Sequence, residues 1–219
     1  LGLGAGSIKT EYDEAGLSFD PGRTRVERLA ESVTIIKRLL KGEPVTFAGR
    51  HYCVTGHTIA PPPAQKPHPP ILIGGNGPRL LALAAREADI VGFSGLTFRQ
   101  GGAAPPDLSA WRVAGIDERV QRVRDIAGDE RFAQLELNAL VQLVAVTDDR
   151  RSAAEELAGR WPQLTPDEIL QSPYALIGTV DQLVDELRAH RDRWGISYYV
   201  VHEPYLEEFA PVVARLAGT

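Results

Sequence analysis

The chain has 219 residues, of which 43% are hydrophobic. It contains 24 lysines and arginines and 29 aspartates and glutamates, which gives a net charge of −5. That length supports a substantial hydrophobic core, and the mild acidity without a basic cluster argues against a nucleic-acid partner. No apolar run is long enough to span a membrane and the single Cys53 cannot form an internal disulfide, so we expect a cytoplasmic protein without membrane contact, in which Cys53 is a small buried side chain.

The first residues have the pattern of a strand interior rather than of the start of a protein. The sequence contains no methionine, and it opens with leucine and glycine in alternation. We therefore expect further residues upstream of Leu1 in the complete protein. After this stretch, residues 9–22 are polar and rich in turn-forming residues, which predicts a loop.

A long helix is predicted for residues 24–42, because their apolar side chains recur at helical spacing. Thr24 and Glu27 have the spacing of a capping box at its start, and Gly42 suits the left-handed position after its end. Two later threonines that precede helices have the same capping spacing: Thr165 with Glu168, and Thr179 with Gln182.

Residues 45–54 alternate between apolar and polar and predict a small β-hairpin, and a run of prolines between residues 61 and 70 predicts a stiff connector. Three histidines fall on these two segments: His51, His57 and His68. Their spacing does not suit metal coordination, so we expect surface histidines and no metal site.

Buried strands alternate with helices through the rest of the chain. Continuous apolar runs predict strands at residues 71–73, 90–93, 135–146 and 197–201, and helical spacing predicts helices at 80–88, 116–126, 152–157, 180–194 and 205–216, with a loop rich in Gly, Ala and Pro at 96–110. This order is typical of a parallel sheet covered by helices. The linkers are too short to separate domains, so we predict an α/β fold with a single domain over residues 1–219.

A glycine-rich turn follows the strand at 71–73, where the carboxyl ends of parallel strands place ligand sites. It consists of Gly74, Gly75, Asn76, Gly77 and Pro78. Glycine lets the backbone take positive φ and approach a ligand closely, and the free N–H groups of a helix start favour an anion. The turn therefore predicts a phosphate cradle to which Asn76 could add a donor, with a tight turn and helix cap as the alternative. Arg79 either neutralises the phosphate or is a solvated surface arginine.

Two further segments fall at strand ends. Residues 2–7 approach a dinucleotide-binding fingerprint, but Ser7 replaces the last glycine and no helix is predicted directly after it. A second loop lined by backbone is still expected there, in which Ser7 and Thr10 offer hydroxyls to a ligand or instead bond to the local backbone. His202 follows the last buried strand and either holds a substrate or moves a proton, or simply caps a loop.

Several motifs, taken together and in this order, resemble the luciferase-like monooxygenase superfamily, especially the deazaflavin branch that uses coenzyme F420. They lie at residues 2–6 with Glu11 and Tyr12 after them, and at 25–29, 42–52, 69–75 and 177–180. The resemblance runs through nearly the whole chain and implies a TIM (β/α)₈ barrel, of which the chain matches only the part from about the fourth strand onward. The first β/α units are absent, and the hairpin at 45–54 is similar to the family's insertion after its fourth helix.

In that family, the loops after the fourth and fifth strands bind the cofactor. By position, the resemblance assigns cofactor binding to two sets of residues: Ala5, Gly6, Ser7 and Thr10, and Gly74, Gly75, Asn76 and Gly77. It assigns no catalytic residue within this chain. Sugar-phosphate dehydrogenases of the family carry a glutamate where this chain has Ser7, so that activity is not expected here.

The resemblance implies an oxidoreductase in which reduced F420 passes a hydride to a small organic substrate, with His202 as a candidate substrate contact and the loop at 96–110 covering the site. Two alternatives stay open: FMN as the cofactor of a monooxygenase, and a part-barrel without activity that binds a phosphate ligand. Because an incomplete barrel leaves strand edges open, we also expect the chain to form a homodimer.

Overall fold

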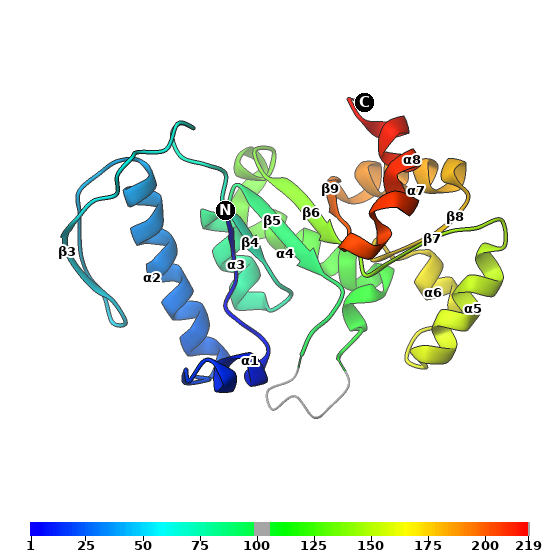
Figure 1. The fold of residues 1–219 in the computed structure, drawn as a ribbon, viewed down its shortest axis with the longest axis horizontal. Helices are drawn as coiled ribbons and strands as arrows, with labels where there is room; N and C mark the ends of the chain where they lie inside the picture. Colours follow the sequence, from blue (N-terminus) through cyan, green and yellow to red (C-terminus); the bar gives the residue numbers. More distant parts are fainter. Residues whose placement is uncertain (99–105, 219) are drawn as a thin grey trace.

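The computed structural model describes residues 1–98 and 106–218. A parallel five-stranded sheet in the order β1-β4-β5-β6-β9 forms the middle of the molecule (Figure 1). Its strands are β1 (Gly2–Leu3), β4 (Leu72–Gly74), β5 (Ile90–Ser94), β6 (Glu136–Leu140) and β9 (Ile196–Val200). The predicted parallel sheet is confirmed. Within the described residues it does not close into a barrel, because β1 and β9 remain its two edges.

Two small sheets accompany the central one. They are the antiparallel hairpin of β2 (Val45–Ala48) and β3 (Cys53–His57), which confirms the predicted hairpin, and the parallel pair of β7 (Leu143–Val146) and β8 (Ala175–Gly178). The helices are α1 (Lys9–Glu14), α2 (Gly22–Leu40), α3 (Pro78–Glu87), α4 (Val113–Phe132), α5 (Arg150–Arg160), α6 (Pro166–Leu170), α7 (Val180–Trp194) and α8 (Leu206–Leu216). The hairpin and α2 lie at one end of the molecule, and β7, β8 and α5 to α8 lie at the other (Figure 1).

Alternation along the central strands divides their side chains between two faces of the sheet. One face packs with α3 and α4 into the main core and carries Ile71, Ile73, Val91, Phe93, Leu137 and Ala139, all buried. Burying a large apolar side chain stabilises the fold by about 1.5–3 kcal/mol, so these side chains determine which face of the sheet packs against the helices. The other face carries Leu72, Gly74, Gly92, Asn138, Leu140 and Val200, which line a cleft.

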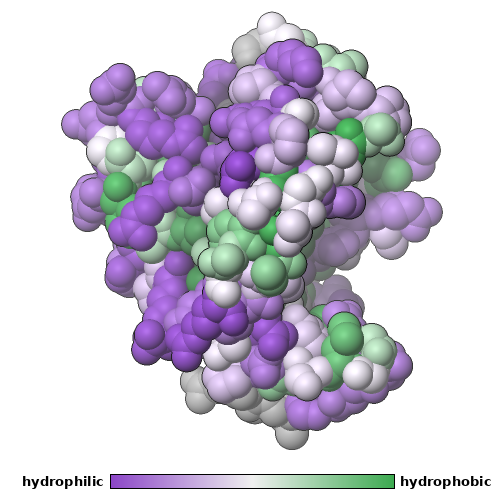
Figure 2. Space-filling model, turned by 90° about the vertical axis from the view of Figure 1, so that its left-hand side faces the viewer, coloured by the Kyte–Doolittle hydropathy of each residue, from purple (hydrophilic) through white to green (hydrophobic). Residues whose placement is uncertain are grey.

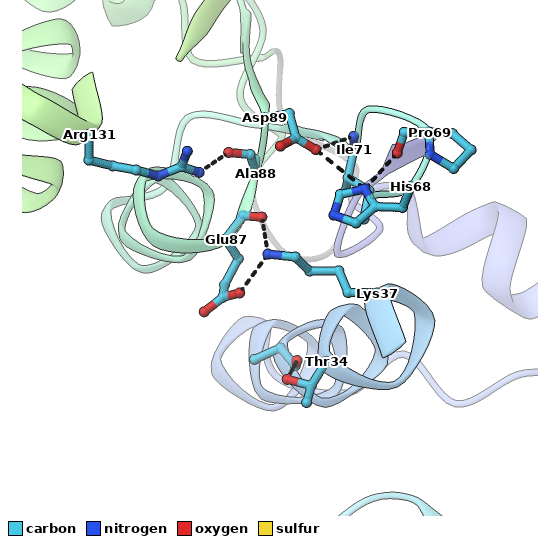
Figure 3. Close-up of polar contacts among 10 residues, drawn as sticks. Thr34, Lys37, His68, Pro69, Ile71, Glu87, Ala88, Asp89 and Arg131 are labelled. Carbon is cyan, nitrogen blue, oxygen red and sulfur yellow. Dashed lines mark hydrogen bonds and ion pairs between the residues drawn. The ribbon is translucent and has the colours of Figure 1, made fainter. Parts of the chain in front are cut away.

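Polar contacts fix the edge of the sheet where β4 and β5 begin (Figure 3). The Asp89 carboxylate accepts a hydrogen bond from the backbone N–H of Ile71 at 2.8 Å. His68 Nδ1 lies 2.9 Å from the carbonyl oxygen of Pro69 and 3.8 Å from Asp89, and the side chain is buried. The prediction of a surface position for His68 is therefore wrong, because the proline connector turns this residue under the start of β4.

Two cationic side chains join helices at the same edge (Figure 3). Lys37 of α2 donates from Nζ to the carbonyl oxygen of Glu87 at 3.0 Å and to its carboxylate at 3.1 Å. Arg131 of α4 donates to the carbonyl oxygen of Ala88. Helices α2, α3 and α4 are thereby tied together at the edge of the sheet that is opposite the cleft.

The short helix α1 stands where the sequence predicted a loop. It has six residues and no buried side chain, so it lacks the apolar stripe on which helix prediction relies. Lys9 and Asp13 form an ion pair of 2.5 Å one turn apart on this helix.

The apolar run at 135–146 is two strands, β6 and β7, rather than the single strand that was predicted. The chain changes sheets between them, because Val141 N–H donates to the carbonyl of Val200 while Gln142 N–H donates to the carbonyl of Tyr174, both at 2.8 Å. The partner strand β8 was not predicted at all.

Helix capping was predicted correctly at two sites and wrongly at a third. Thr165 and Thr179 both form complete capping boxes. Thr24 caps nothing, because α2 begins two residues earlier, at Gly22, with Pro21 at the N-cap position.

The prediction that Cys53 is buried was also wrong, since it lies exposed at the start of strand β3.

Among the described residues, no helix is both long and apolar enough to cross a bilayer. Over the same part of the chain, no three His, Cys, Asp or Glu side chains gather in a geometry that could hold a metal ion.

Candidate functional site

A cleft of about 860 Å³ lies over the open face of the sheet, at the carboxyl ends of β1, β4 and β5. Every residue predicted to bind a cofactor lines it except Thr10, which is exposed on α1. His202 also lies outside the lining; it is exposed just beyond Val200, which does line the cleft. The structure thus brings the two predicted loops together and leaves these two side chains apart from them.

The turn between β4 and α3 presents free backbone N–H groups to this cleft. The Gly75 N–H is not among them, because it donates to the carbonyl of Gly92 at 2.9 Å. Within the described residues, the next amides have no acceptor: those of Asn76, Gly77, Arg79 and Leu80. They surround the start of α3, whose first position is Pro78, so the helix dipole also favours an anion there.

Gly75 is required by the shape of this turn. Its φ is +145°, a conformation that residues with a Cβ rarely adopt, and a Cβ placed there would lie 2.3 Å from Leu80 Cδ2. A larger residue would strain the backbone at this φ and would also force the Leu80 side chain to move.

The side chain of Asn76 does not point to a ligand but joins two loops. Its Nδ2 donates to the carbonyl oxygen of Leu96 at 3.1 Å and to Thr97 Oγ1 at 3.0 Å. Its Oδ1 accepts from the backbone N–H of Ser94 at 3.3 Å. The predicted side-chain donor is therefore engaged within the protein, and only the backbone amide of Asn76 is left for a ligand.

The loop after β1 forms the facing wall of the cleft and is held by α2. Arg25 Nε donates to the carbonyl oxygens of Ala5 and Gly6, both at 3.2 Å, and Tyr12 donates to Ala5 at 3.3 Å. Gly6 has a φ of +73° and lies directly against the Tyr12 hydroxyl. Ser7, the last residue of this wall, makes no hydrogen bond within the described residues and lies exposed at the cleft.

The floor of the cleft is a narrow shelf of small residues. Gly74 and Gly92 are paired across β4 and β5, and a Cβ on Gly92 would lie 3.2 Å from Gly74 Cα. Next along the row is Asn138, 4% exposed, whose Nδ2 donates to the carbonyl of Tyr198 at 3.0 Å. Its Oδ1 accepts no hydrogen bond within the described residues, so it can receive one from a ligand. The sequence analysis missed Asn138, although an amide inside an apolar strand was a visible signal.

Of the predicted loop at 96–110, residues 99–105 fall outside the described part of the chain. On either side of them, Thr97 and Asp107 exchange backbone hydrogen bonds of 3.2 and 2.8 Å. Leu96, Thr97 and Phe98 line the cleft.

The charged side chains that line the cleft in the described residues are Glu11, Arg23, Arg25 and Arg79. Arg25 is committed to the loop after β1 and Arg23 is paired with Glu27 at 2.7 Å, so Arg79, in the first turn of α3, is the cation left to face an anion at the free amides. The site therefore combines backbone donors with a positive rim, which favours a phosphate or carboxylate.

A buried carboxylate and a buried histidine with strongly shifted pKa values lie elsewhere, between α5 and α7. Burial raises the pKa of Glu186 from 4.5 to about 7, although Arg150, 3.0 Å away, acts to lower it. Burial lowers the pKa of His190, one turn further along α7, from 6.5 to about 4. These groups line a separate hollow and not the cleft.

Residues 1–198 match the protein family described as luciferase-like monooxygenase. Three solved structures have the same fold. An F420-dependent secondary alcohol dehydrogenase, solved with an F420–acetone adduct, is 17% identical with a TM-score of 0.65. The monooxygenase RslO1 from Streptomyces bottropensis is 21% identical with a TM-score of 0.64. The coenzyme F420-dependent tetrahydromethanopterin reductase from Methanopyrus kandleri is 16% identical with a TM-score of 0.67.

These alignments take in almost all of this chain but only part of each neighbour. They cover 97%, 92% and 98% of this chain, and 69%, 60% and 72% of the three neighbours in the same order. At such identities the likeness concerns the fold alone. The predicted luciferase-like barrel type, present in part, is confirmed.

Proposed function

This chain belongs to the luciferase-like monooxygenase family, and from that premise we propose that it is an oxidoreductase in which reduced coenzyme F420 donates a hydride to a small organic substrate. The observation that carries the proposal is the group of free amides at Asn76, Gly77, Arg79 and Leu80, which opens onto a cleft large enough for a cofactor. The F420-dependent secondary alcohol dehydrogenase, which has the same fold and was solved with an F420–acetone adduct, supports the choice of F420.

The residues of the cleft fit a cofactor that has a phosphate at one end and a flat ring at the other. A phosphate at the start of α3 would receive charge-assisted hydrogen bonds from the free amides, and Arg79 lies beside them. The shelf of Gly74 and Gly92 has no side chain that would keep a ring from the sheet, and Asn138 Oδ1 could accept a hydrogen bond at its side.

When bound, the reduced deazaflavin supplies the hydride, and the protein supplies position and surroundings. Asn76 holds the loops after β4 and β5 in one arrangement, so that the amides keep their spacing. Arg25 holds the loop after β1 at the facing wall. The apolar side chains of Leu72, Leu140 and Val200 keep water from the floor of the cleft.

FMN carries a similar phosphate and ring, and its use would make the protein a monooxygenase. The monooxygenase RslO1, which has the same fold, supports this second candidate. Titration of the protein with F420 and with FMN, followed by intrinsic fluorescence and by a turnover assay, separates the two. Tight binding of FMN with no binding of F420 would overturn our first choice, and binding of either without turnover would favour a ligand-binding part-barrel.

We further propose that the chain pairs as a homodimer, because β1 and β9 are unpaired edges in the described sheet. Sedimentation velocity at several protein concentrations tests this, and a monomer at all of them would refute it.

His202 stays a candidate substrate contact. Its substitution by Ala should raise the KM for the substrate without changing the affinity for the cofactor.

A further inference from the structure

A second hollow, of about 530 Å³, lies among α5, α6 and α7 and shares no lining residue with the cleft in the described part of the chain. These helices are at one end of the molecule and α2 is at the other (Figure 1). The α2 end faces the viewer in Figure 2, where large hydrophilic areas surround a smaller apolar strip, so the hollow belongs to a different part of the surface. We refer to it as the α7 hollow, because most of its lining residues belong to that helix.

A row of polar side chains runs along α7 into this hollow. Gln182, Glu186 and His190 are spaced by four residues, so they lie on one face of the helix. The row leads inward, because Gln182 is exposed, Glu186 is 12% exposed and His190 is 7% exposed. Arg150 of α5 meets the row, and its Nη2 donates to Glu186 Oε2 at 3.0 Å. Charged and polar side chains seldom occupy such buried positions unless each of them is paired.

Three side chains at this place have a buried polar atom without a partner in the described residues. The atoms are Nε of Arg150, Oε1 of Glu186 and Nδ1 of His190. The hydroxyl of Tyr199 on β9 is unpartnered as well, and its ring lies 6.4 Å from that of His190. Burial raises the pKa of Tyr199 and of Tyr174, so neither phenol brings a charge to the cluster. Because buried polar atoms in folded proteins are nearly always paired, four in one place indicate that a binding partner is missing.

Near pH 6, Arg150 has a charge that its neighbours do not balance. Burial raises the pKa of Glu186 to about 7 and lowers that of His190 to about 4, so both are then mostly neutral. The proton of neutral Glu186 belongs on Oε1, because Oε2 accepts from Arg150. Oε1 lies 4.0 Å from His190 Nε2, which makes Nε2 the acceptor of the imidazole and leaves the proton on Nδ1. Arg150 Nε and His190 Nδ1 are then two donors without an acceptor.

The other charged groups around the hollow are already paired. Arg193 donates to Asp117 of α4 at 2.9 Å, and Asp185 lies 3.8 Å from Arg188 on its own helix. The hollow therefore has one uncompensated positive charge while Glu186 is protonated. The partner that is missing is an acceptor with a negative charge.

We propose that the α7 hollow binds a small organic carboxylate with an apolar body, in the state in which Glu186 is protonated. The carboxylate would accept hydrogen bonds from Arg150 Nε and His190 Nδ1 and balance the charge of the guanidinium. The Arg150 side chain is 31% exposed, so it can turn toward a ligand without displacing α5. Val113 and Leu170 offer apolar surface in the same hollow, whose volume is sufficient for a ring. This site is separate from the proposed cofactor cleft and does not depend on it.

Binding should be coupled to the uptake of a proton. Ionised Glu186 holds Arg150 as its own counter-ion and repels a second carboxylate. A requirement for protonated Glu186 lowers the affinity about tenfold between pH 6 and pH 8, because the protonated fraction of a group with a pKa of about 7 falls by that factor. At pH 8, each bound carboxylate should therefore bring about one proton with it.

The test uses benzoate as the ligand and benzamide as its uncharged counterpart. The full chain is titrated calorimetrically with each at pH 6 and pH 8, in two buffers of different ionisation enthalpy, which gives the affinity and the number of protons taken up. We expect benzoate to bind about tenfold more tightly at pH 6 than at pH 8. At pH 6, benzamide should bind at least about tenfold more weakly than benzoate, because it does not neutralise Arg150.

Three variants locate the effect. Glu186→Gln keeps the size of the side chain but cannot ionise, so it should bind benzoate equally at both pH values and without proton uptake. Arg150→Gln should weaken benzoate binding at pH 6 by about tenfold or more. Arg160→Gln is the matched control, because Arg160 is also on α5 but pairs with Glu156 outside the hollow, and it should leave binding unchanged. Thermal unfolding shows whether each variant is folded.

Four outcomes would overturn the proposal. They are no binding of benzoate by the native protein, equal binding of benzoate and benzamide, the same benzoate affinity at both pH values, and an equal loss in Arg150→Gln and Arg160→Gln. Binding that Arg150→Gln leaves unchanged also overturns it, because benzoate would then be held elsewhere, such as at the free amides of the cleft. If Arg150→Gln does not fold, the pH profiles of the native protein and of Glu186→Gln decide, and equal slopes would refute the assignment.

Discussion

Replacement of Gly77 by proline tests the amide cradle with a change of one hydrogen-bond donor. Gly77 has φ −70° and ψ 142°, and proline fixes φ near −65°, so the backbone can stay where it is. The Gly77 N–H has no acceptor in the described residues, and a Cβ added there meets nothing within 4 Å. Gly77→Pro therefore removes an N–H that the fold does not use, and Gly77→Ala is the matched control that keeps it.

The size of the effect follows from the type of bond that is lost. A hydrogen bond to a charged group contributes about 1.5–3 kcal/mol, which corresponds to a factor of about 10–100 in affinity. We expect Gly77→Pro to weaken binding of a phosphate-bearing cofactor by at least about tenfold, and Gly77→Ala to change it by less than about threefold.

Calorimetric titration with the phosphorylated cofactor and with its dephosphorylated form is the assay, and thermal unfolding shows whether both variants remain folded. The dephosphorylated form should bind both variants equally. A folded Gly77→Pro protein that binds the phosphorylated cofactor as well as Gly77→Ala does would refute the cradle. An equal loss for both forms of the cofactor would also refute it, because the defect would then not concern the phosphate.

Two further predictions concern Asn76 and the buried pair on α7. Asn76→Ala removes the three hydrogen bonds that join the loops after β4 and β5, and we expect about tenfold weaker cofactor binding by fluorescence titration; unchanged binding would contradict the positioning role. Because burial raises the pKa of Glu186 to about 7, the folded state keeps a proton on this carboxyl group at pH values where the unfolded state has lost it. The stability that this proton contributes is lost as the pH rises from 4.5 through 7. Because burial lowers the pKa of His190 to about 4, its contribution is present above 6.5 and is lost as the pH falls toward 4. The two contributions change in opposite directions between pH 4.5 and 6.5, so urea unfolding over this range should show stability rising with pH in Glu186→Gln and falling with pH in His190→Gln; parallel pH profiles of the two variants would contradict both assignments.

The parallel sheet was predictable because its strands are short, continuous apolar runs that alternate with helices. Runs such as Ile71 to Ile73 need no alternation to be recognised, and the helices between them have apolar stripes. The same property hid the break between β6 and β7. Val141 is buried at the point where the chain moves from one sheet to the next, and apolar residues continue before and after it, so the sequence does not mark the break.

The spacing of the capping box identified candidate helix starts, but one of the three was not the actual start. Thr165 and Thr179 each follow a break in the apolar pattern, and both are N-caps. Thr24 satisfies the same spacing, but Pro21 sets the backbone for a helix start earlier in the chain. Helix α1 was missed because it buries no side chain.

The candidate site was predictable where it consists of backbone and not where it depends on contacts across loops. The glycines before Pro78 indicate an exposed turn at a helix start from sequence alone. That the Asn76 side chain would be used to reach Leu96 and Thr97 depends on how two loops meet in space. The place of Asn138 on the floor depends likewise on its pairing with Gly92.

The polar ties of Lys37, Asp89 and Arg131 stand at the far edge of the sheet from the cleft. The contacts that hold the sheet together and the residues that would bind a ligand thus lie at opposite ends of the same strands. Someone redesigning this protein for a new reactant could rebuild the segments beyond Ser94 or Val200 while the scaffold beneath keeps its shape. Tolerance of such changes, read from deep mutational libraries, should rise steadily from one rim to the other.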